Sequence, residues 1–214
     1  LGGIANLSLI PPKSGPERLS NILGWDCGPA NSLIDLAISQ ITKEKYDYDK
    51  DGLFAAEGKS DENIIKIWLK EPFFQRLPPK STGREQFGLK DLENRKKDVP
   101  DLSESNLIAT LTAFSAAVIA QDLYNLSKIS SLIPNEIFIT GGGCKNPVLF
   151  KEIQSRCLGI TIKSIEDLGI PVQFREALSF ALLAWWNILK HNGNSPYVTG
   201  ASRSCVLGSR VYPV

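Results

Sequence analysis

Short apolar runs that predict β-strands alternate along this chain with patterns that predict helices, and glycine clusters stand at two of the junctions. Gly3 to Ile10 and Leu19 to Asp26 are apolar runs separated by a proline- and glycine-rich turn, which predicts a hairpin. Glu136 to Thr140 and Ile160 to Ile165 predict two further strands. This alternation is typical of an α/β fold or of mixed α+β layers.

The predicted helices differ in how they expose apolar side chains. Asn31 to Ile41 has apolar residues at helical spacing on one face, and the helix predicted from Pro147 to Cys157 begins with a proline, which suits a first helical position. Ser105 to Ser127 predicts a long helix directed toward the core. Gln173 to Lys190 is apolar nearly all round, so we expect that helix to be largely buried.

A shorter helix is expected around Ile64 to Leu69. Ser60, with Asn63 three residues later, gives it only a partial amino-terminal cap. Pro72 is expected to end it, because proline cannot continue a helix without losing a hydrogen bond.

Composition excludes several classes of protein. The 214 residues are 43% apolar and 22% charged, with 24 Lys and Arg against 23 Asp and Glu, which argues against disorder, a coiled coil or a basic nucleic-acid module. With a single histidine and scattered cysteines, the sequence predicts no zinc site and reduced thiols. The uncharged run from Ser105 to Gln121 is too short and too polar for a membrane span, and no export signal opens the chain. A cytoplasmic protein of one large or two small domains is expected.

The opening residues suggest that the sequence is part of a longer one. Leu1 is followed at once by a strand pattern, and the chain has no methionine. We therefore expect a fragment.

Two glycine clusters carry the first functional hypothesis. Gly2 and Gly3 precede Asn6 in the hairpin, whereas Gly141, Gly142 and Gly143 precede Asn146 between a strand and a helix. Glycine lets the backbone approach a phosphate or a base closely, and the amino terminus of a helix favours anions. Nucleotide contact is one interpretation, and a tight turn without a ligand is the other. Neither cluster completes a P-loop or a dinucleotide-binding motif.

The turn after the second predicted strand contains Asp26, Gly28 and Asn31. Asp26 could hold a magnesium-bound water, because Mg²⁺ prefers one or two carboxylates together with phosphate oxygens. The simpler alternative, which the residues alone favour, is that Asp26 and Asn31 cap and tie down the turn.

A polar loop and one helix start supply candidates for binding an anionic or sugar ligand. Lys80, Thr82 and Arg84 combine cations and a hydroxyl in one loop, and arginine can grip a carboxylate with two hydrogen bonds. A solvated charge run, in which Arg84 is compensated by Glu85, is the alternative. Glu176 is either a first-turn acid that complements the helix dipole or an acceptor for sugar hydroxyls. No catalytic triad can be assembled.

Taken together in their order, these segments closely resemble the anhydro-N-acetylmuramic acid kinase family, from Leu1 to Pro213. The string from Lys80 to Glu85 is far more specific than any glycine cluster. The segments that carry the resemblance are Gly2-Gly3-Ile4-Ala5-Asn6-Leu7-Ser8, the run from Asp26 to Asp35, Tyr48-Asp49-Lys50-Asp51-Gly52, the run from Pro79 to Glu85, Gly141-Gly142-Gly143-Cys144-Lys145-Asn146-Pro147, Glu176-Ala177-Leu178-Ser179-Phe180-Ala181, Asn194 and Val198-Thr199-Gly200-Ala201. The chain departs from the family's usual Asp-Thr-Gly-Pro-Gly-Asn at Cys27 and Ala30.

The resemblance implies an actin/hexokinase-like (ribonuclease H-like) fold, with residues 1–214 forming one carboxy-terminal lobe in which helices flank a mixed β-sheet. It further implies a cytoplasmic transferase of peptidoglycan and amino-sugar turnover, which opens the anhydro ring with water and phosphorylates O6 from ATP with Mg²⁺. The partners implied are the sugar and ATP, with neither nucleic acid nor membrane, and a homodimer of the longer protein.

The resemblance also assigns roles to residues. Gly2, Gly3 and Asn6 match a phosphate-binding hairpin, and Gly141, Gly142, Gly143 and Asn146 match a nucleotide-side motif. Asp26, Gly28 and Asn31 are expected near the phosphates. Glu176, Lys80, Thr82 and Arg84 are expected at the sugar. The water-activating aspartate and a Gly-Thr-Ser-x-Asp-Gly loop are expected upstream of Leu1, so the chain alone should have no catalytic residue and no turnover.

Two other interpretations remain open. A non-catalytic nucleotide-binding module of the same fold would share these motifs. Another enzyme of the superfamily would as well, although an activator ATPase with an iron–sulfur cluster should show a cysteine spacing that this chain lacks.

Overall fold

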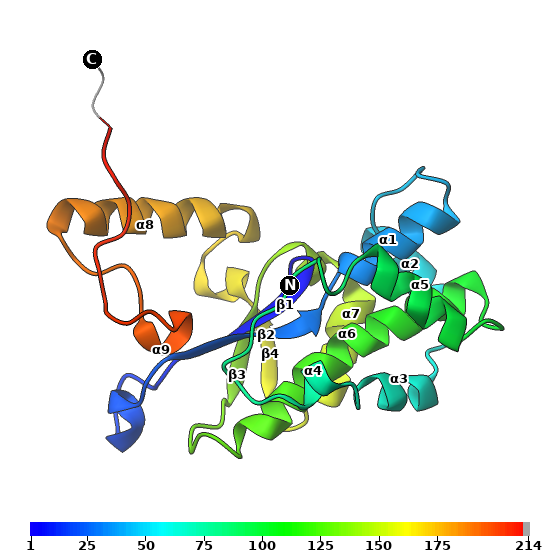
Figure 1. Cartoon of the computed structure of the whole chain (residues 1–214), viewed down its shortest axis with the longest axis horizontal. Coiled ribbons are helices and arrows are strands. Elements are labelled where there is room, and N and C mark those ends of the chain that lie inside the picture. The colour runs from blue at the N-terminus through cyan, green and yellow to red at the C-terminus, as the bar shows by residue number, and fades with distance from the viewer. Residues whose placement is uncertain (212–214) are drawn as a thin grey trace.

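The computed structural model describes residues 1–211, and Pro213, where the sequence resemblance ends, lies outside them. Figure 1 shows a body of helices packed beside the strands, with the last two helices and the carboxy-terminal segment set to one side. The helices in chain order are α1 (Ser32–Ile41), α2 (Leu53–Glu57), α3 (Glu62–Trp68), α4 (Pro72–Gln75), α5 (Leu89–Asp98), α6 (Glu104–Leu126), α7 (Pro147–Arg156), α8 (Arg175–Leu189) and α9 (Pro196–Thr199).

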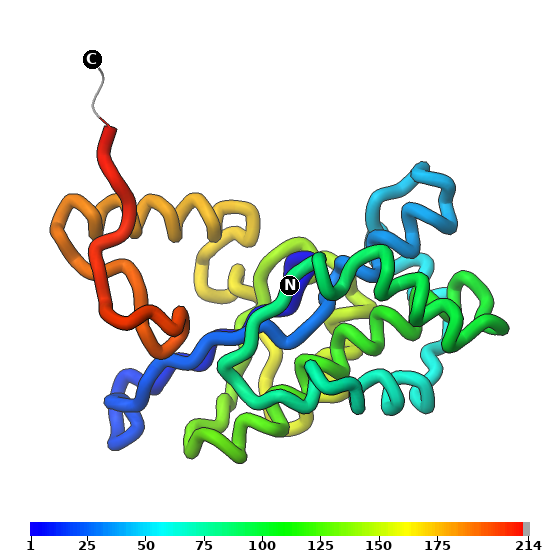
Figure 2. The backbone as a smooth tube through the Cα atoms, in the orientation of Figure 1, coloured from blue at the N-terminus to red at the C-terminus, as the bar shows by residue number. Residues whose placement is uncertain are grey.

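The strands form two small sheets in the described part of the chain. β1 (Ile4–Leu9) pairs antiparallel with β2 (Leu23–Pro29), so the predicted hairpin is confirmed. β3 (Glu136–Ile139) pairs parallel with β4 (Thr161–Ser164), and α7 forms the crossover between them. The tube in Figure 2 shows how far the hairpin extends from the body. The fold is thus mixed α/β, as the alternation of strands and helices predicts.

Helix α6 is the centre of the hydrophobic core. Phe114 on this helix contacts Trp68 and Phe74 edge-on, with ring centroids 5.2 and 5.4 Å apart, and Phe74 stacks on Phe87. Length and composition alone would allow α6 to cross a membrane, but 78% of its most apolar window is buried inside the protein. The prediction of a buried helix is therefore confirmed.

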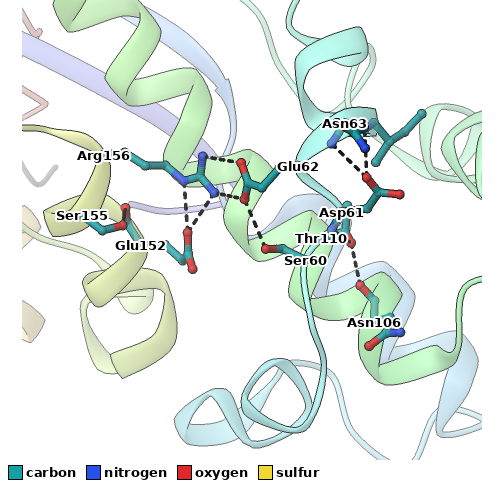
Figure 3. A network of polar contacts seen from close by, with 10 residues as sticks. Ser60, Asp61, Glu62, Asn63, Asn106, Thr110, Glu152, Ser155 and Arg156 are labelled. Atoms are coloured by element: carbon teal, nitrogen blue, oxygen red, sulfur yellow. Dashed lines mark hydrogen bonds and ion pairs between the residues drawn. The ribbon is translucent and has the colours of Figure 1, made fainter.

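Polar contacts attach α3 to the helices around it (Figure 3). Asp61 caps α3 by accepting hydrogen bonds from the backbone N–H groups of Asn63 and Ile64, so the expectation of a cap from Ser60 is wrong. Arg156 on α7 pairs with both Glu62 and Glu152. Pro72 does not end α3, which stops at Trp68, but occupies the first turn of α4, where proline's missing N–H costs nothing.

The expectation that α8 is buried is wrong for this chain. None of its residues is buried, and Leu178, Phe180 and Trp185 are 54%, 70% and 56% exposed. The helix itself forms as predicted, because its residues favour a helix whether or not anything packs against it.

Candidate functional site

A large cleft of about 1410 Å³ lies where several chain segments meet. The start of α1, the turn after β3 and the start of α8 form its wall, together with the loop before α5 and the Asp47–Asp51 loop. Of the residues singled out from the sequence, it brings together Gly2, Asn31, Arg84, Gly141, Gly142, Asn146 and Glu176. Gly3, Asn6, Asp26, Gly28, Lys80, Thr82 and Gly143 are not among its lining residues.

The glycines after β3 have different tasks. Gly141 has a φ of +93°, and a Cβ there would lie 2.6 Å from the Leu1 carbonyl oxygen. Gly143 donates its N–H to the same oxygen at 3.0 Å. Gly142 lines the cleft, and a Cβ on it would meet no atom within 4 Å. Gly141 and Gly143 therefore allow the turn to pack closely against Leu1. Gly142 instead leaves its backbone accessible from the cleft.

The amino terminus of α1 is occupied by the chain's own first residues. Ala30 and Ser32 donate their N–H groups to the Gly3 carbonyl, and Asn31 donates its N–H to the Gly2 carbonyl. The Asn31 side-chain amide also donates to the Gly2 carbonyl, at 2.7 Å. These contacts use the N–H groups of Ala30, Asn31 and Ser32, so those three donors are not free for a ligand.

Asn146 lies at the cleft but acts as a helix cap. Its Oδ1 accepts hydrogen bonds from the N–H groups of Val148 and Leu149 at 3.0 and 3.1 Å, and the residue is 6% exposed. Asparagine is one of the residues preferred at this position. The cap fixes the direction in which α7 leaves the Gly142–Lys145 turn.

Charged side chains also line the cleft. Arg84 lies against the backbone of Gly3, where a Cβ would come within 2.9 Å of its Nε. Glu176, in the first turn of α8, is exposed and its nearest ion-pair partner is Arg175 at 3.5 Å. Arg84 and Glu176 therefore offer the cleft a guanidinium and a carboxylate that are both exposed.

Asp35 on α1 is a cleft residue that sequence reasoning did not single out. Burial raises its pKa to about 6, against an opposing effect of nearby Arg84. The available signal was a carboxylate on the otherwise apolar stretch Ser32–Ile38. Asp47, Asp49 and Asp51 also line the cleft and were not assigned as site residues from the sequence.

Asp26 is held by a loop and by its strand neighbour. Its carboxylate accepts hydrogen bonds from the Asn6 amide, the Ser81 hydroxyl and the Thr82 N–H at 2.8, 2.9 and 3.0 Å. Its own N–H donates to the Lys80 carbonyl. These contacts tie the turn down, as the simpler alternative predicts, and a role for Asp26 at the phosphates stays a prediction.

Lys80 does not reach the cleft. Its ammonium group pairs with Asp122 at 2.8 Å, and the two side chains are 0% and 2% exposed. The Trp25 indole N–H donates to the same carboxylate at 3.0 Å. In this arrangement Lys80 is part of the core, which corrects its expected place at the sugar: its ammonium group is 0% exposed and Lys80 does not line the cleft.

Gly28 and Thr82 also contact other parts of the protein instead of the cleft. Gly28 has a φ of +148°, and a Cβ there would lie 2.7 Å from the Phe74 ring. The Thr82 hydroxyl donates to the side-chain oxygen of Gln86 at 2.9 Å. Gly28 therefore serves close packing on the aromatic core, and Thr82 helps to shape the loop that positions Arg84.

Comparison with known proteins agrees with these motifs. A family described as anhydro-N-acetylmuramic acid kinase matches residues 1–213. Two proteins named anhydro-N-acetylmuramic acid kinase, from Prochlorococcus marinus strains MIT 9211 and MIT 9313, are 58% and 57% identical over 213 residues. A third with that name, from Parasynechococcus marenigrum strain WH8102, is 51% identical. Each match covers 100% of this chain and 56% of the relative, so the chain spans about half the length of the curated relatives it matches. The chain belongs to the anhydro-N-acetylmuramic acid kinase family.

Proposed function

We propose that this chain is part of an ATP-dependent kinase that opens the anhydro ring of anhydro-N-acetylmuramic acid and phosphorylates its O6. The oxygen of water goes to C1, the bond between C1 and O6 breaks, and O6 receives the terminal phosphoryl group of ATP. The products are N-acetylmuramic acid 6-phosphate and ADP. The observation that carries the proposal is that Gly142, Arg84 and Glu176 line a single cleft in a chain of this family.

The nucleotide is placed at the turn after β3. Gly142 leaves a stretch of backbone open to the cleft, and a planar base or a phosphate can approach only where no Cβ intervenes. Gly2 and Asn31 lie beside it in the same wall. Gly3, Gly141 and Gly143 then act indirectly, because they allow the segments that form this wall to pack closely together.

The sugar is placed between Arg84 and Glu176. The substrate carries a carboxylate, and a guanidinium can hold a carboxylate with two hydrogen bonds. The Glu176 carboxylate can accept hydrogen bonds from sugar hydroxyls. Phosphoryl transfer depends mainly on positioning the reactants and on stabilising charge, which these side chains can supply from fixed elements.

Mg²⁺ fits the cleft as a partner of ATP rather than as a metal held by protein alone. Within residues 1–211 no group of His, Cys, Asp or Glu side chains could hold a metal ion by itself. Mg²⁺ usually takes one or two carboxylates plus phosphate oxygens. Asp35 and Asp51 line the cleft and could supply a carboxylate, whereas both oxygens of Asp26 already accept hydrogen bonds.

The proposal extends to the organisation of the whole protein. We place residues 1–214 in the carboxy-terminal lobe of an actin/hexokinase-like kinase, whose other lobe closes over ATP. We also propose a cytoplasmic homodimer. The mixed α/β fold is compatible with one lobe of such a kinase, and the share of the relatives that the chain spans leaves room for another. The homodimer and the compartment rest on the family resemblance alone.

The test uses an extended protein, defined as this chain joined to the region that the Prochlorococcus marinus relatives have in addition. Incubation with ATP, the anhydro sugar and ¹⁸O-labelled water should give N-acetylmuramic acid 6-phosphate with the label at C1. Gly142→Val should raise the KM for ATP, and Glu176→Gln should raise the KM for the sugar. Glu17→Gln, in the hairpin turn away from the cleft, is the control. Label in phosphate instead of the sugar, or no product, would contradict the proposed reaction.

A further inference from the structure

Helix α8 is covered only on one side and only toward its carboxy-terminal end, since Phe180, nearer the start on that same side, is 70% exposed. On the covered side, Asn187 donates from its amide to the carbonyls of Leu207 and Gly208 at 2.8 and 3.0 Å. Arg210 in the same segment donates a hydrogen bond to the Asn187 side-chain oxygen at 2.9 Å. Leu183 lies on the same side, because Gly193 sits between it and Leu207. The carboxy-terminal segment thus crosses α8 near Asn187, toward the end of the helix, as Figure 1 shows.

The open side carries a continuous apolar stripe, which we call the α8 stripe. From Phe174, the residue just before the helix, to Ile188 its members are three or four residues apart, and Leu189 lies four residues after Trp185. This spacing places them on one face of the helix, opposite Leu183 and Asn187. The α8 stripe consists of Phe174 (56% exposed), Leu178 (54%), Leu182 (46%), Trp185 (56%), Ile188 (54%) and Leu189 (45%).

The α8 stripe does not have the composition of a helix face that is exposed to water. Between Glu176 and Lys190 the helix has no charged residue, in contrast to the exposed face of α5, which carries several lysines and acids. Large apolar side chains gathered in one patch mark an interaction surface, because their exposure to water is unfavourable. The apolar pattern of Gln173 to Lys190 predicted burial that residues 1–211 do not supply, which leaves this surface open to a further covering element.

We propose that the α8 stripe is the docking surface for the additional region of the longer polypeptide, which presents an uncharged, apolar face to it. The relatives are longer than the matched segment, which is 56% of their length, so such a region exists in them. The stripe also begins beside Arg175 and Glu176, which line the cleft. Whatever covers it therefore lies against the mouth of the cleft, where a second lobe of the same kinase has to be. This inference rests on the proposed function in assuming that second lobe.

Hydrogen exchange measured by mass spectrometry tests the docking without any catalytic readout. The amides of α8 should exchange roughly 100-fold more slowly in the extended protein than in the 214-residue chain, because packing on the stripe suppresses local opening. The amides of α6, which is buried already, serve as the internal control. Equal exchange of α8 in both proteins would overturn the proposal.

A matched pair of variants separates docking from general effects on folding. Leu178→Asp lies in the stripe, and Leu158→Asp lies after α7 at a residue that is 84% exposed. In the extended protein only Leu178→Asp should return α8 to fast exchange, by at least about tenfold. In the 214-residue chain neither variant should change the exchange of α8.

A second copy is the competing occupant. In that case the 214-residue chain would form a dimer in sedimentation experiments, α8 would become protected as concentration rises, and Leu178→Asp would abolish both. That result would overturn the proposal. Loss of kinase activity with α8 still protected would contradict the proposed function but not the docking, so the two can fail separately.

Discussion

Replacing Lys80 with methionine tests the reassignment of this residue from the ligand site to the core. Methionine keeps much of the unbranched, apolar stem but removes the ammonium group that pairs with Asp122 at 2.8 Å. The partner carboxylate would remain 2% exposed with only hydrogen bonds to compensate its charge. Breaking a buried pair in this way costs about 3–5 kcal/mol, a large part of the roughly 5–15 kcal/mol by which a domain is stable.

The cost should depend on pH in a definite direction. Burial raises the pKa of Asp122, and Lys80 counteracts the increase. Without Lys80 the pKa of Asp122 in the folded state rises further, while in the unfolded chain it stays ordinary. At mildly acid pH the folded variant then binds a proton that the unfolded chain does not bind. The stability deficit of Lys80→Met is therefore greatest at neutral pH and shrinks as the pH falls.

Urea denaturation at pH 7 and at pH 5 measures both effects. The control is Lys96→Met, which removes an exposed lysine 3.6 Å from Glu93 and should cost less than about 0.5 kcal/mol. Lys80→Met combined with Asp122→Asn should regain most of the lost stability, because no unpaired charge remains. A Lys80→Met variant as stable as Lys96→Met but weaker in sugar binding would refute the reasoning and restore Lys80 to the ligand site.

Three further predictions each test a single contact or a single titrating group. Gly28→Ala should lower the free energy of unfolding by about 1–3 kcal/mol, because its Cβ would meet Phe74 at 2.7 Å, whereas Gly2→Ala, with its nearest atom at 3.9 Å, should be nearly neutral in thermal denaturation. Asp61→Ala should cost about 1 kcal/mol through loss of the α3 cap, and equal effects of Ser60→Ala would argue against that cap. Carbon-13 NMR should give Asp35 a pKa of about 6. Because this pKa is raised, stability from this group falls as pH rises from about 4 to above 6, and Asp35→Asn should flatten that slope; a midpoint near 4 would show that Asp35 is not desolvated.

The sequence predicted the elements better than their surroundings. The hairpin, α1, α6, β3, α7 and β4 follow from local patterns of apolar residues, turns and caps, and the structure confirms them. The burial of α8 could not be predicted correctly, because an all-round apolar helix says only that partners are needed and not where they come from. Asp61 was missed as a cap because Ser60 stood next to it in an equally plausible position.

The candidate site was predicted in part for a similar reason. Gly142, Arg84 and Glu176 come from segments far apart in the chain and meet at one cleft. Lys80 and Arg84 are four residues apart in one loop, yet one enters the core and the other lies at the cleft. Residue type and spacing cannot tell these apart, since the partner that buries Lys80 is Asp122 on α6.

Calorimetric titration of a non-hydrolysable ATP analogue into the chain tests most directly whether the turn after β3 admits a nucleotide. The test variant is Gly142→Val, whose side chain would extend into open space and should leave thermal stability unchanged. The control is Ser20→Val, on the exposed hairpin turn. We predict saturable binding that Gly142→Val weakens at least about tenfold, or about 1.4 kcal/mol, and that Ser20→Val leaves intact. Equal affinity of the analogue for the chain and for Gly142→Val would contradict the account.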